Sequence, residues 1–308
     1  MALLNHSRSF KTYKDIALIP SGQSNSQITD GCLVLEGGAW RGLYTEGVTD
    51  YLLENNLNFH TVIGVSAGAL SGIYYMCGQI GNAARVNLGY RKDRDYVGVR
   101  PMIRDQGITG FSFLFDEMAK YYPLDTERLC DSRRHFYAVV TNCLTGKPEY
   151  KTSHDADDIA FYARTSATVP YVSRPVIIGN TPYLDGGISD CVPFRWAEEN
   201  GYKKIIVVRT RHREFRDTPR EHTKIDERLY KNYPELLKDL LTSPERYNSM
   251  LDELDRQEKE GRVFVIAPKE PVSVRRFETD LDKLGELYWQ GYHDMKAQLP
   301  GLRQYLHG

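Results

Sequence analysis

Short apolar runs alternate with longer segments of helical spacing, and this alternation limits the possible folds more than any other feature of the sequence. The run Ile205-Ile206-Val207-Val208, within a predicted strand at residues 204–209, is continuously apolar. Such runs are typical of strands that helices cover on both faces of a sheet. The pattern therefore predicts an α/β fold with a mainly parallel central sheet and helices on both sides. The other predicted strands are at residues 32–35, 61–64, 136–141, 175–178 and 262–267.

The chain divides into three predicted regions. Residues 1–27 are expected to form a loose N-terminal arm, because Ser-Gly-Gln-Ser-Asn-Ser occupies residues 21–26. Residues 28–210 are expected to form the core. Residues 211–308 are charge-rich and mostly helical with one further strand, and form either a separate unit or part of the same domain. The predicted helices are at residues 43–55, 67–79, 230–241, 244–259 and 281–299.

Charge and cysteine content exclude several classes of protein. Lys and Arg number 40 against 41 Asp and Glu, a net charge of −1, so nucleic acid is not an expected partner. Five cysteines without a C-x-x-C pair favour a reducing compartment over a disulfide framework or a zinc site. Residues 61–82 carry no charge, yet Ser66, Ser71 and Gln79 favour a strand followed by a helix over a transmembrane segment. With no secretory signal at the N-terminus, we expect a soluble, cytoplasmic protein.

The sequence Gly64-Val65-Ser66-Ala67-Gly68 lies between a predicted strand and a predicted helix. A G-x-S-x-G at this position is typical of a nucleophile elbow, in which glycines allow a sharp turn that exposes the serine hydroxyl. The N-terminal N–H groups of the following helix point toward such a hydroxyl. The alternative is a tight strand–helix turn that happens to contain a serine.

A second glycine-rich segment, Gly37-Gly38-Ala39-Trp40-Arg41-Gly42, also follows a predicted strand. Glycines here allow successive backbone N–H groups to face an anion or a developing oxyanion. The segment has neither the Gly-Lys-Ser/Thr of a nucleotide-binding P-loop nor the spacing of a dinucleotide fingerprint. Alone it indicates an anion site; upstream of a nucleophile elbow it indicates an oxyanion hole.

The third motif, Asp185-Gly186-Gly187, follows an apolar stretch and is either a plain turn or the position of a catalytic base. As a base, Asp185 would take the proton from Ser66. A carboxylate with a reference pKa of about 3.9 is a weak base for an alcohol. It can serve if it hydrogen-bonds the serine closely and an oxyanion hole stabilises the product of attack.

A Ser-His-Asp triad is the competing arrangement. No histidine follows the predicted last strand closely, and none of the later histidines has a suitable setting, so a Ser–Asp pair is favoured. Asp190 is the second candidate for the base. The histidines considered are His212, His222, His293 and His307.

The three motifs, in this order, resemble the patatin-like phospholipase family, and its bacterial members more closely. The segment from Arg164 to Pro170 also resembles the family. The resemblance implies a three-layer α/β/α fold with a helical C-terminal extension. It implies a serine acyl hydrolase that cleaves lipid esters with a Ser66–Asp185 dyad and needs no metal or organic cofactor. The backbone N–H groups of Gly37, Gly38 and Ala39 would form the oxyanion hole.

Two residues of this sequence depart from the family pattern Asp-Gly-Gly-Gly-x-Arg-Gly. Glu36 stands in place of the aspartate, and Ala39 stands in place of the third glycine. Ala39 keeps its N–H but resists positive φ, so the hole is expected more firmly at Gly37 and Gly38. Arg41 would orient the loop or meet a phosphate head group; the alternative is an exposed, merely structural arginine.

Several alternatives stay open at this level. The same acyl-enzyme could serve an acyltransferase, and a non-catalytic lipid-binding or regulatory protein could keep the fold. The expected partner is a lipid or ester substrate, with contact at a membrane surface as one alternative, and the sequence predicts no oligomeric state. Residues 111–115 either start a buried strand or helix, or line an acyl channel or touch a membrane. The arginines between residues 209 and 220 either form a solvated face or meet anionic head groups.

Overall fold

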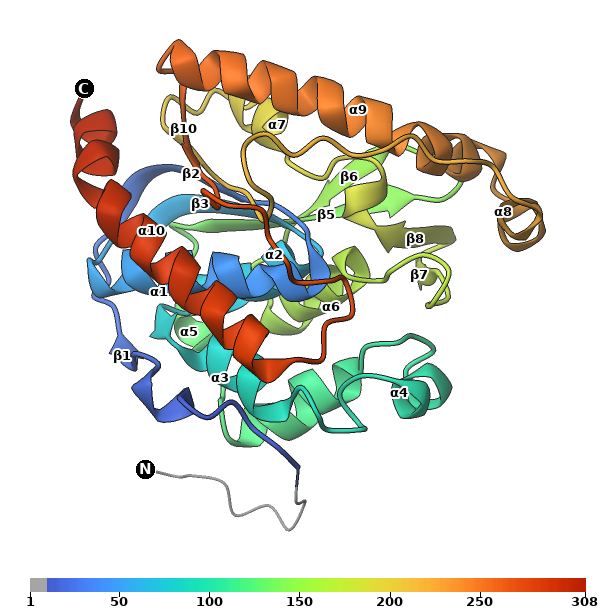
Figure 1. The fold of residues 1–308 in the computed structure, drawn as a ribbon, viewed down its shortest axis with the longest axis horizontal. Helices are drawn as coiled ribbons and strands as arrows, with labels where there is room; N and C mark the ends of the chain where they lie inside the picture. The colour runs from blue at the N-terminus through green and yellow to red at the C-terminus, as the bar shows by residue number, and fades with distance from the viewer. Residues whose placement is uncertain (1–9) are drawn as a thin grey trace.

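A computed structural model describes residues 10–308. Its centre is an eight-stranded sheet with the order β10-β9-β2-β3-β5-β8-β7, to which β6 adds by pairing with β5 (Figure 1). The five strands from β10 to β5 run parallel, and β8, β7 and β6 pair antiparallel. The mainly parallel α/β architecture is therefore confirmed. The strands are β2 (Thr29–Leu35), β3 (Phe59–Val65), β5 (His135–Asn142), β6 (Pro148–Lys151), β7 (Val176–Ile178), β8 (Thr181–Asp185), β9 (Ile205–Val208) and β10 (Val263–Ile266), with β1 (Gly22–Gln23) and β4 (Gln79–Ile80) in a separate pair.

Helices cover both faces of this sheet. Alternate residues of each strand point to opposite faces, so each strand has side chains that pack with the helices on either face. Leu33 and Leu35 of β2 pack with α1, α2, α3, α6 and α10, whereas Cys32 and Val34 pack with α7 and α9. Figure 1 shows α7 and α9 on the opposite side of the sheet from α1, α2 and α6. The helices are α1 (Gly42–Glu54), α2 (Ala67–Met76), α3 (Asn82–Tyr90), α4 (Val99–Arg104), α5 (Thr126–Leu129), α6 (Ala156–Ser166), α7 (Phe194–Glu199), α8 (Lys224–Tyr230), α9 (Pro234–Lys259) and α10 (Leu281–His307).

The predicted helix break before Pro244 is wrong, since α9 runs through this residue without ending. Proline has no N–H to donate to the carbonyl four residues earlier, here that of Leu240. The hydroxyl of Ser243 donates to that carbonyl at 3.0 Å and so satisfies it. The helix predicted from residue 230 also begins later, because Pro234 occupies its first turn.

The expected looseness of the N-terminal arm is wrong for residues 10–27, and residues 1–9 lie outside the described residues. Tyr13 and Ile19 are buried, and β1 pairs with β4. The Tyr13 ring lies so close to Gly285 of α10 that a Cβ there would be 2.2 Å from its Cε2 atom. The first described segment is therefore packed against the last helix of the chain.

The C-terminal region contributes to the same sheet and to one of its helical layers. Strand β10 extends the sheet beyond β9, and α10 packs along α1. This packing is close because a Cβ on Gly47 would lie 2.0 Å from the Tyr288 carbonyl oxygen, and one on Gly291 would lie 2.1 Å from that of Tyr44. We propose on these contacts that residues 211–308 are integral to the core rather than a separate domain.

The arginine-rich stretch is not a uniformly solvated face. Arg209 is fully buried, and its Nη1 lies 3.5 Å from a carboxylate oxygen of Asp255 on α9. Arg213 and Arg216 also pair with carboxylates of α9. These ion pairs therefore hold the segment that follows β9 against α9.

Two further predictions concern apolar segments. Residues 111–115 begin a buried helical segment, with Phe113 only 1% exposed. The uncharged stretch of residues 61–82 contains most of β3 and all of α2, a strand followed by a helix as predicted. Within residues 10–308, every helix is too short or too polar to cross a membrane.

Candidate active site

Ser66 occupies the turn between the carboxyl end of β3 and the first residue of α2. Its backbone has φ 55° and ψ −122°, a strained conformation for a residue with a side chain. The turn is tight because Gly68 packs against β2, where a Cβ would lie 2.4 Å from the Leu35 carbonyl oxygen. This is the strand–turn–helix setting that the G-x-S-x-G sequence predicts.

The Ser66 hydroxyl donates a 2.7 Å hydrogen bond to Oδ2 of Asp185, the last residue of β8. The other carboxylate oxygen, Oδ1, accepts the N–H of Gly187 at 2.8 Å. The hydroxyl of Thr141 on β5 donates to the Asp185 carbonyl at 2.8 Å. These bonds fix the carboxylate and direct Oδ2 at the serine. Both residues are buried, each 7% exposed.

Burial raises the pKa of Asp185 to about 6, because desolvation disfavours its charged form. Hydrogen bonds from Ser66 and Gly187, and the positive charge of Arg276, act in the opposite direction. The carboxylate is thus a stronger base than an exposed aspartate and is still ionised at neutral pH.

The glycine loop is held by Glu36, the residue that replaces the family's aspartate. The buried carboxylate accepts hydrogen bonds from the Thr210 N–H after β9 and from the Tyr247 hydroxyl on α9. The Thr210 hydroxyl also donates to the Gly37 carbonyl at 3.0 Å. A Cβ on Gly38 would lie 2.6 Å from the Thr210 Oγ1 atom, so this position has room only for glycine.

The loop lies directly beside Ser66, because a Cβ atom added to Gly37 would be 3.3 Å from the Cβ atom of Ser66. Among the backbone hydrogen bonds that residues 10–308 make outside helices and strands, none is donated by Gly37, Gly38 or Ala39. Ala39 adopts a φ of +48°, the left-handed conformation that glycine adopts freely and alanine resists. Ala67 begins α2, so its N–H also lacks an acceptor within the helix.

Arg41 is buried, only 9% exposed, which contradicts the exposed alternative considered for it. Burial and the nearby charge of Arg211 lower its pKa to about 10, so it stays cationic at neutral pH. Its Nε atom has no hydrogen-bond partner among the described residues. It lines a cavity that also reaches Ser66 and Asp185.

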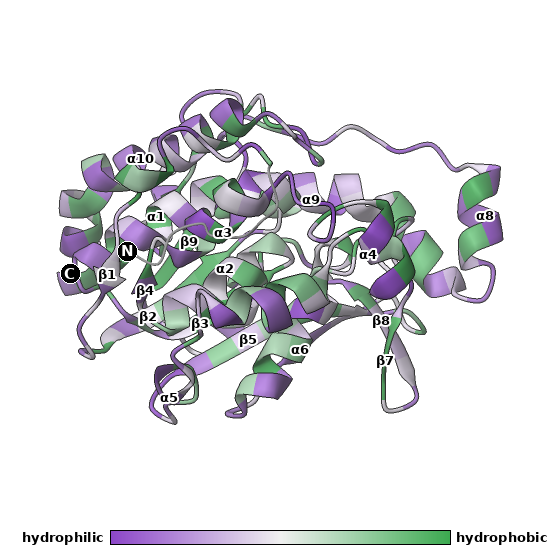
Figure 2. Ribbon diagram, turned by 90° about the horizontal axis from the view of Figure 1, so that it is seen from below, coloured by the Kyte–Doolittle hydropathy of each residue, from purple (hydrophilic) through white to green (hydrophobic). Residues whose placement is uncertain are grey.

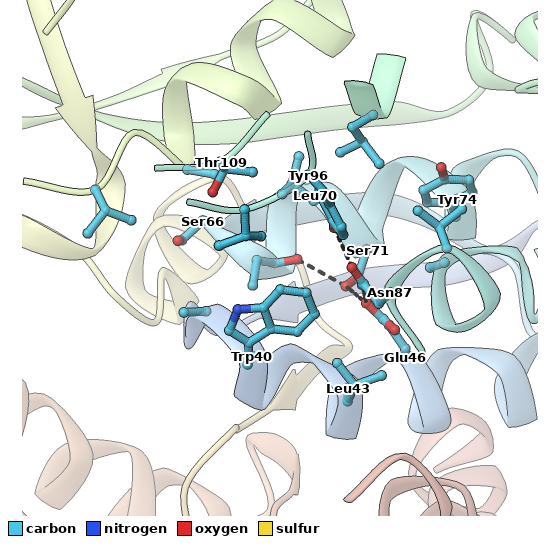
Figure 3. A pocket seen from close by; sticks show the side chains of 18 of the residues that line it. Trp40, Leu43, Glu46, Ser66, Leu70, Ser71, Tyr74, Asn87, Tyr96 and Thr109 are labelled. Atoms are coloured by element: carbon cyan, nitrogen blue, oxygen red, sulfur yellow. Dashed lines mark hydrogen bonds between the residues drawn. The ribbon is translucent and has the colours of Figure 1, made fainter. Parts of the chain in front are cut away.

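Two cavities of different character meet at Ser66. A polar one of about 530 Å³ is lined by the Ser66–Asp185 pair, by the cations Arg41, Arg220 and Arg276, and by the carboxylates Asp217 and Glu221. A narrower one of about 80 Å³, shown in Figure 3, extends from Ser66 between apolar side chains of α1, α2 and the segment after α3. Its apolar wall includes Trp40, Leu43, Leu70, Val86, Val97, Leu114 and Phe277. Leu114 lies within residues 111–115, for which the lining of an acyl channel is one of the predicted alternatives.

Sequence reasoning missed Ser166, at the end of α6. Its hydroxyl accepts the backbone N–H of Ser66 at 2.9 Å and so supports the strained turn. The carbonyl of Thr168 accepts the Asp185 N–H at 3.0 Å. Both lie in the segment from Arg164 to Pro170, so the resemblance of that segment was the one indication available.

The other candidate bases are engaged elsewhere. Asp190 accepts the Tyr150 hydroxyl at 2.9 Å. His212 and His222 lie beside glutamates, and His293 stacks on Trp289. In the described part of the chain, no histidine is a hydrogen-bond partner of Ser66 or Asp185.

The protein has a mixed α/β fold with a serine at a strand–helix turn, and its sequence shows the family to which it belongs. The patatin-like phospholipase profile matches residues 33–197, more than half of the chain. The protein therefore belongs to the patatin-like phospholipase family, a family of lipid hydrolases. Residues 233–307 match a second profile, described as a domain of unknown function, DUF6363.

Two proteins similar to this chain extend the comparison. The uncharacterized protein YjjU of Escherichia coli K12 is 28% identical over 245 residues, which cover 78% of this chain and 69% of YjjU. The crystal structure of VipD from Legionella pneumophila aligns with a TM-score of 0.49 at 14% identity, covering 97% of this chain and 72% of VipD.

Proposed function

We propose that the protein hydrolyses carboxylic esters of lipids through an acyl-enzyme on Ser66, with Asp185 as the base. The observation that carries the proposal is the 2.7 Å hydrogen bond between the Ser66 hydroxyl and the Asp185 carboxylate. It lies beside loop N–H groups that have no acceptor among the described residues. A nucleophile, its base and donors for an oxyanion are the groups that acyl transfer requires.

The mechanism begins when Asp185 Oδ2 accepts the proton of Ser66 as Oγ attacks the ester carbonyl carbon. The tetrahedral intermediate collapses, the carbon–oxygen bond to the alcohol breaks, and Asp185 returns the proton to the departing alkoxide. Water then loses a proton to Asp185 and attacks the acyl-enzyme. Collapse of this second intermediate releases the fatty acid and restores the Ser66 hydroxyl.

The negative oxygen of both intermediates would accept hydrogen bonds from Gly37, Gly38 and Ala39. Loss of one such donor typically costs about 3–4 kcal/mol of transition-state stabilisation. The anchoring of this loop by Glu36 and Thr210 supports the assignment, because donors held in place need no reorganisation during the reaction.

The two cavities suggest how a lipid would lie. The apolar cavity suits the acyl chain, and the polar cavity, with Arg41 and Arg276, suits an anionic head group. Guanidinium groups match phosphate oxygens in geometry and charge. We therefore assign a glycerophospholipid as the substrate, with its phosphate on the arginine side of Ser66.

The short helix α4 is the segment best suited to contact a lipid surface. Its side chains Val99, Met102 and Ile103 are 72%, 46% and 80% exposed, with Arg100 between the first two in sequence and Arg104 directly after the third. Figures 1 and 2 both place α4 at the end of the molecule that carries β7 and α8, opposite the C-terminus. Exposed apolar residues among cations suit an anionic bilayer.

Vesicle binding tests this contact. Phosphatidylcholine vesicles with phosphatidylglycerol should bind the protein better than vesicles without it, and Ile103→Ser should weaken binding severalfold. Leu18→Ser, which changes an exposed leucine outside α4, is the matched control. Equal binding by Ile103→Ser and wild type would reject α4 as the contact.

The hydrolytic function is tested by incubating phospholipids of several head groups with wild type and with Ser66→Ala, and measuring released fatty acid. Wild type should release fatty acid, Ser66→Ala should release none above the buffer rate, and both should unfold at similar temperatures. Equal release by the two proteins would refute Ser66 as nucleophile, and no release from any ester would refute the function.

A further inference from the structure

A polar cluster interrupts the wall of the apolar cavity. Glu46 of α1 lines this cavity together with Ser71 of α2, Asn87 of α3 and Tyr96. Figure 3 shows these four side chains gathered on one part of the cavity wall, with Ser66 on another part. We call them the Glu46 cluster. A cavity that took only alkyl chains would gain nothing from a carboxyl group in its wall.

One oxygen of Glu46 is satisfied within the cluster and the other is not. Oε1 accepts the Asn87 Nδ2 group at 2.6 Å and lies 3.5 Å from the Ser71 hydroxyl. Tyr96 in turn donates to the Asn87 carbonyl oxygen. Glu46 is only 3% exposed, and its buried Oε2 atom has no hydrogen-bond partner among the described residues.

Such an unpaired oxygen is costly, since a buried polar group without a partner loses about 1–3 kcal/mol of hydrogen bonding to water. Most buried polar side-chain atoms in folded proteins have a partner, so an exception calls for an explanation. Here the unpaired atom belongs to a residue that lines the proposed acyl site. Oε2 has almost no accessible surface in this structure, so a substrate group in the cavity would satisfy it once the carboxyl group turns toward the cavity.

The position of the cluster sets where that group would lie along the chain. Ser71 follows Ser66 by five residues on α2, which corresponds to a distance of about 8 Å along the helix axis. An acyl chain attached at Ser66 would therefore reach the cluster several carbons beyond the carbonyl.

We propose that the acyl cavity selects acyl chains that carry a hydroxyl group several carbons from the ester, and that Oε2 of Glu46 hydrogen-bonds this hydroxyl. The proposal rests on the proposed function, because it takes Ser66 as the point of acyl attachment. A hydroxyl suits the site since it both donates and accepts. Burial and the neighbouring Asp50 raise the pKa of Glu46 to about 8, so at neutral pH its protonated form can donate.

The first test compares p-nitrophenyl 8-hydroxyoctanoate with p-nitrophenyl nonanoate, which have equal numbers of chain atoms. Wild type should show a kcat/KM about tenfold higher for the hydroxylated ester. Glu46→Leu should bring the ratio to one or below, and Glu46→Gln should retain much of the preference because an amide still hydrogen-bonds. Glu54→Leu, which removes an exposed carboxylate of the same helix, should keep the wild-type ratio.

The proposal is overturned if wild type prefers nonanoate, or if Glu46→Leu keeps the wild-type ratio. A second measurement needs no turnover: calorimetric binding of 8-hydroxyoctanoate and nonanoate to Ser66→Ala. We expect the hydroxy acid to bind about tenfold tighter, and equal or weaker binding would also overturn the proposal. If neither ester is hydrolysed, the proposed function fails, and the binding ratio still decides the role of Glu46.

Discussion

Ser66 and Asp185, 119 positions apart in the chain, share a 2.7 Å hydrogen bond because strand β5 lies between the strands that carry them. In the sheet register, Val65 is opposite Val139 of β5, and Asp185 is opposite the next residue, Val140. Consecutive residues of one central strand therefore hold the end of β3 beside the end of β8. The pairing of the proposed nucleophile with the proposed base is a property of the sheet rather than of flexible loops.

Removal of the proposed base should cost most of the rate. Asp185→Asn keeps an acceptor for the Gly187 N–H but can no longer take the serine proton, so we expect kcat to fall by at least about a hundredfold. Steady-state hydrolysis of a short-chain ester measures this. Asp190→Asn, which alters the carboxylate bonded to Tyr150, is the matched control and should retain the larger part of the activity. The opposite ranking of the two variants would move the base to Asp190.

The pH profile should report the same carboxylate. Asp185 must be ionised to accept a proton, so kcat/KM should rise with pH through a midpoint near 6, the pKa to which burial raises it. The measurement is kcat/KM for one ester between pH 4.5 and 8 at constant ionic strength. A profile that is flat from pH 5 to 7 would contradict the assignment.

Stability should respond to pH in the opposite sense. Because the pKa of Asp185 in the folded protein lies above its usual 3.8, the folded state binds this proton more tightly than the unfolded state. The contribution of this group to stability is then full below about pH 4 and is lost as pH rises through 6. Asp185→Asn should therefore unfold at a higher temperature than wild type at pH 7.5, with little difference at pH 4.

Much of this arrangement follows from local sequence patterns. The strands β2, β3, β5, β9 and β10 and the glycine turn at Ser66 were predictable because apolar runs and glycines report directly on backbone conformation. The continuation of α9 through Pro244 was not, because proline removes one backbone hydrogen bond from a helix, and only the structure reveals that the Ser243 hydroxyl bonds the freed Leu240 carbonyl. The position of β10 beside β9 was likewise outside what a local pattern can reveal.

The glycine loop should not tolerate a methyl group at Gly38. The Cβ of Gly38→Ala would lie 2.6 Å from the Thr210 Oγ1 atom, so the loop must shift and its N–H groups with it. We expect kcat/KM to fall by between about a hundredfold and a thousandfold, the typical effect of losing one oxyanion donor. Gly301→Ala on α10, where the nearest atom is 3.6 Å away, is the control and should be nearly as active as wild type.

Ser166 should matter to both stability and rate. Ser166→Ala leaves the buried N–H of Ser66 without its acceptor, which typically costs about 1–3 kcal/mol. We expect the free energy of unfolding to fall by this amount and kcat/KM to fall roughly tenfold as the turn loosens. Denaturant titration and ester hydrolysis measure the two effects. Ser153→Ala, which removes exposed hydrogen bonds to Asp158 and from the Asp155 N–H, should change neither.

The cavities and their polar groups show where sequence reasoning ends. The Glu46 cluster joins residues of α1, α2 and α3 with Tyr96, and no spacing rule relates these positions. Arg41 could be placed beside the glycine loop from its motif, but its burial depends on how the chain around it packs. Ser66 and Asp185 could be named in advance because each occupies a short motif; their supporting contacts come from distant segments.

The most direct test of the central claim is covalent labelling with a fluorophosphonate, followed by peptide mass spectrometry. The account predicts a single adduct on the Ser66 hydroxyl, formed at least about a hundredfold faster in wild type than in Asp185→Asn, because the carboxylate activates that hydroxyl. An adduct on another residue, or labelling of Ser66 at the same rate in both proteins, would contradict it.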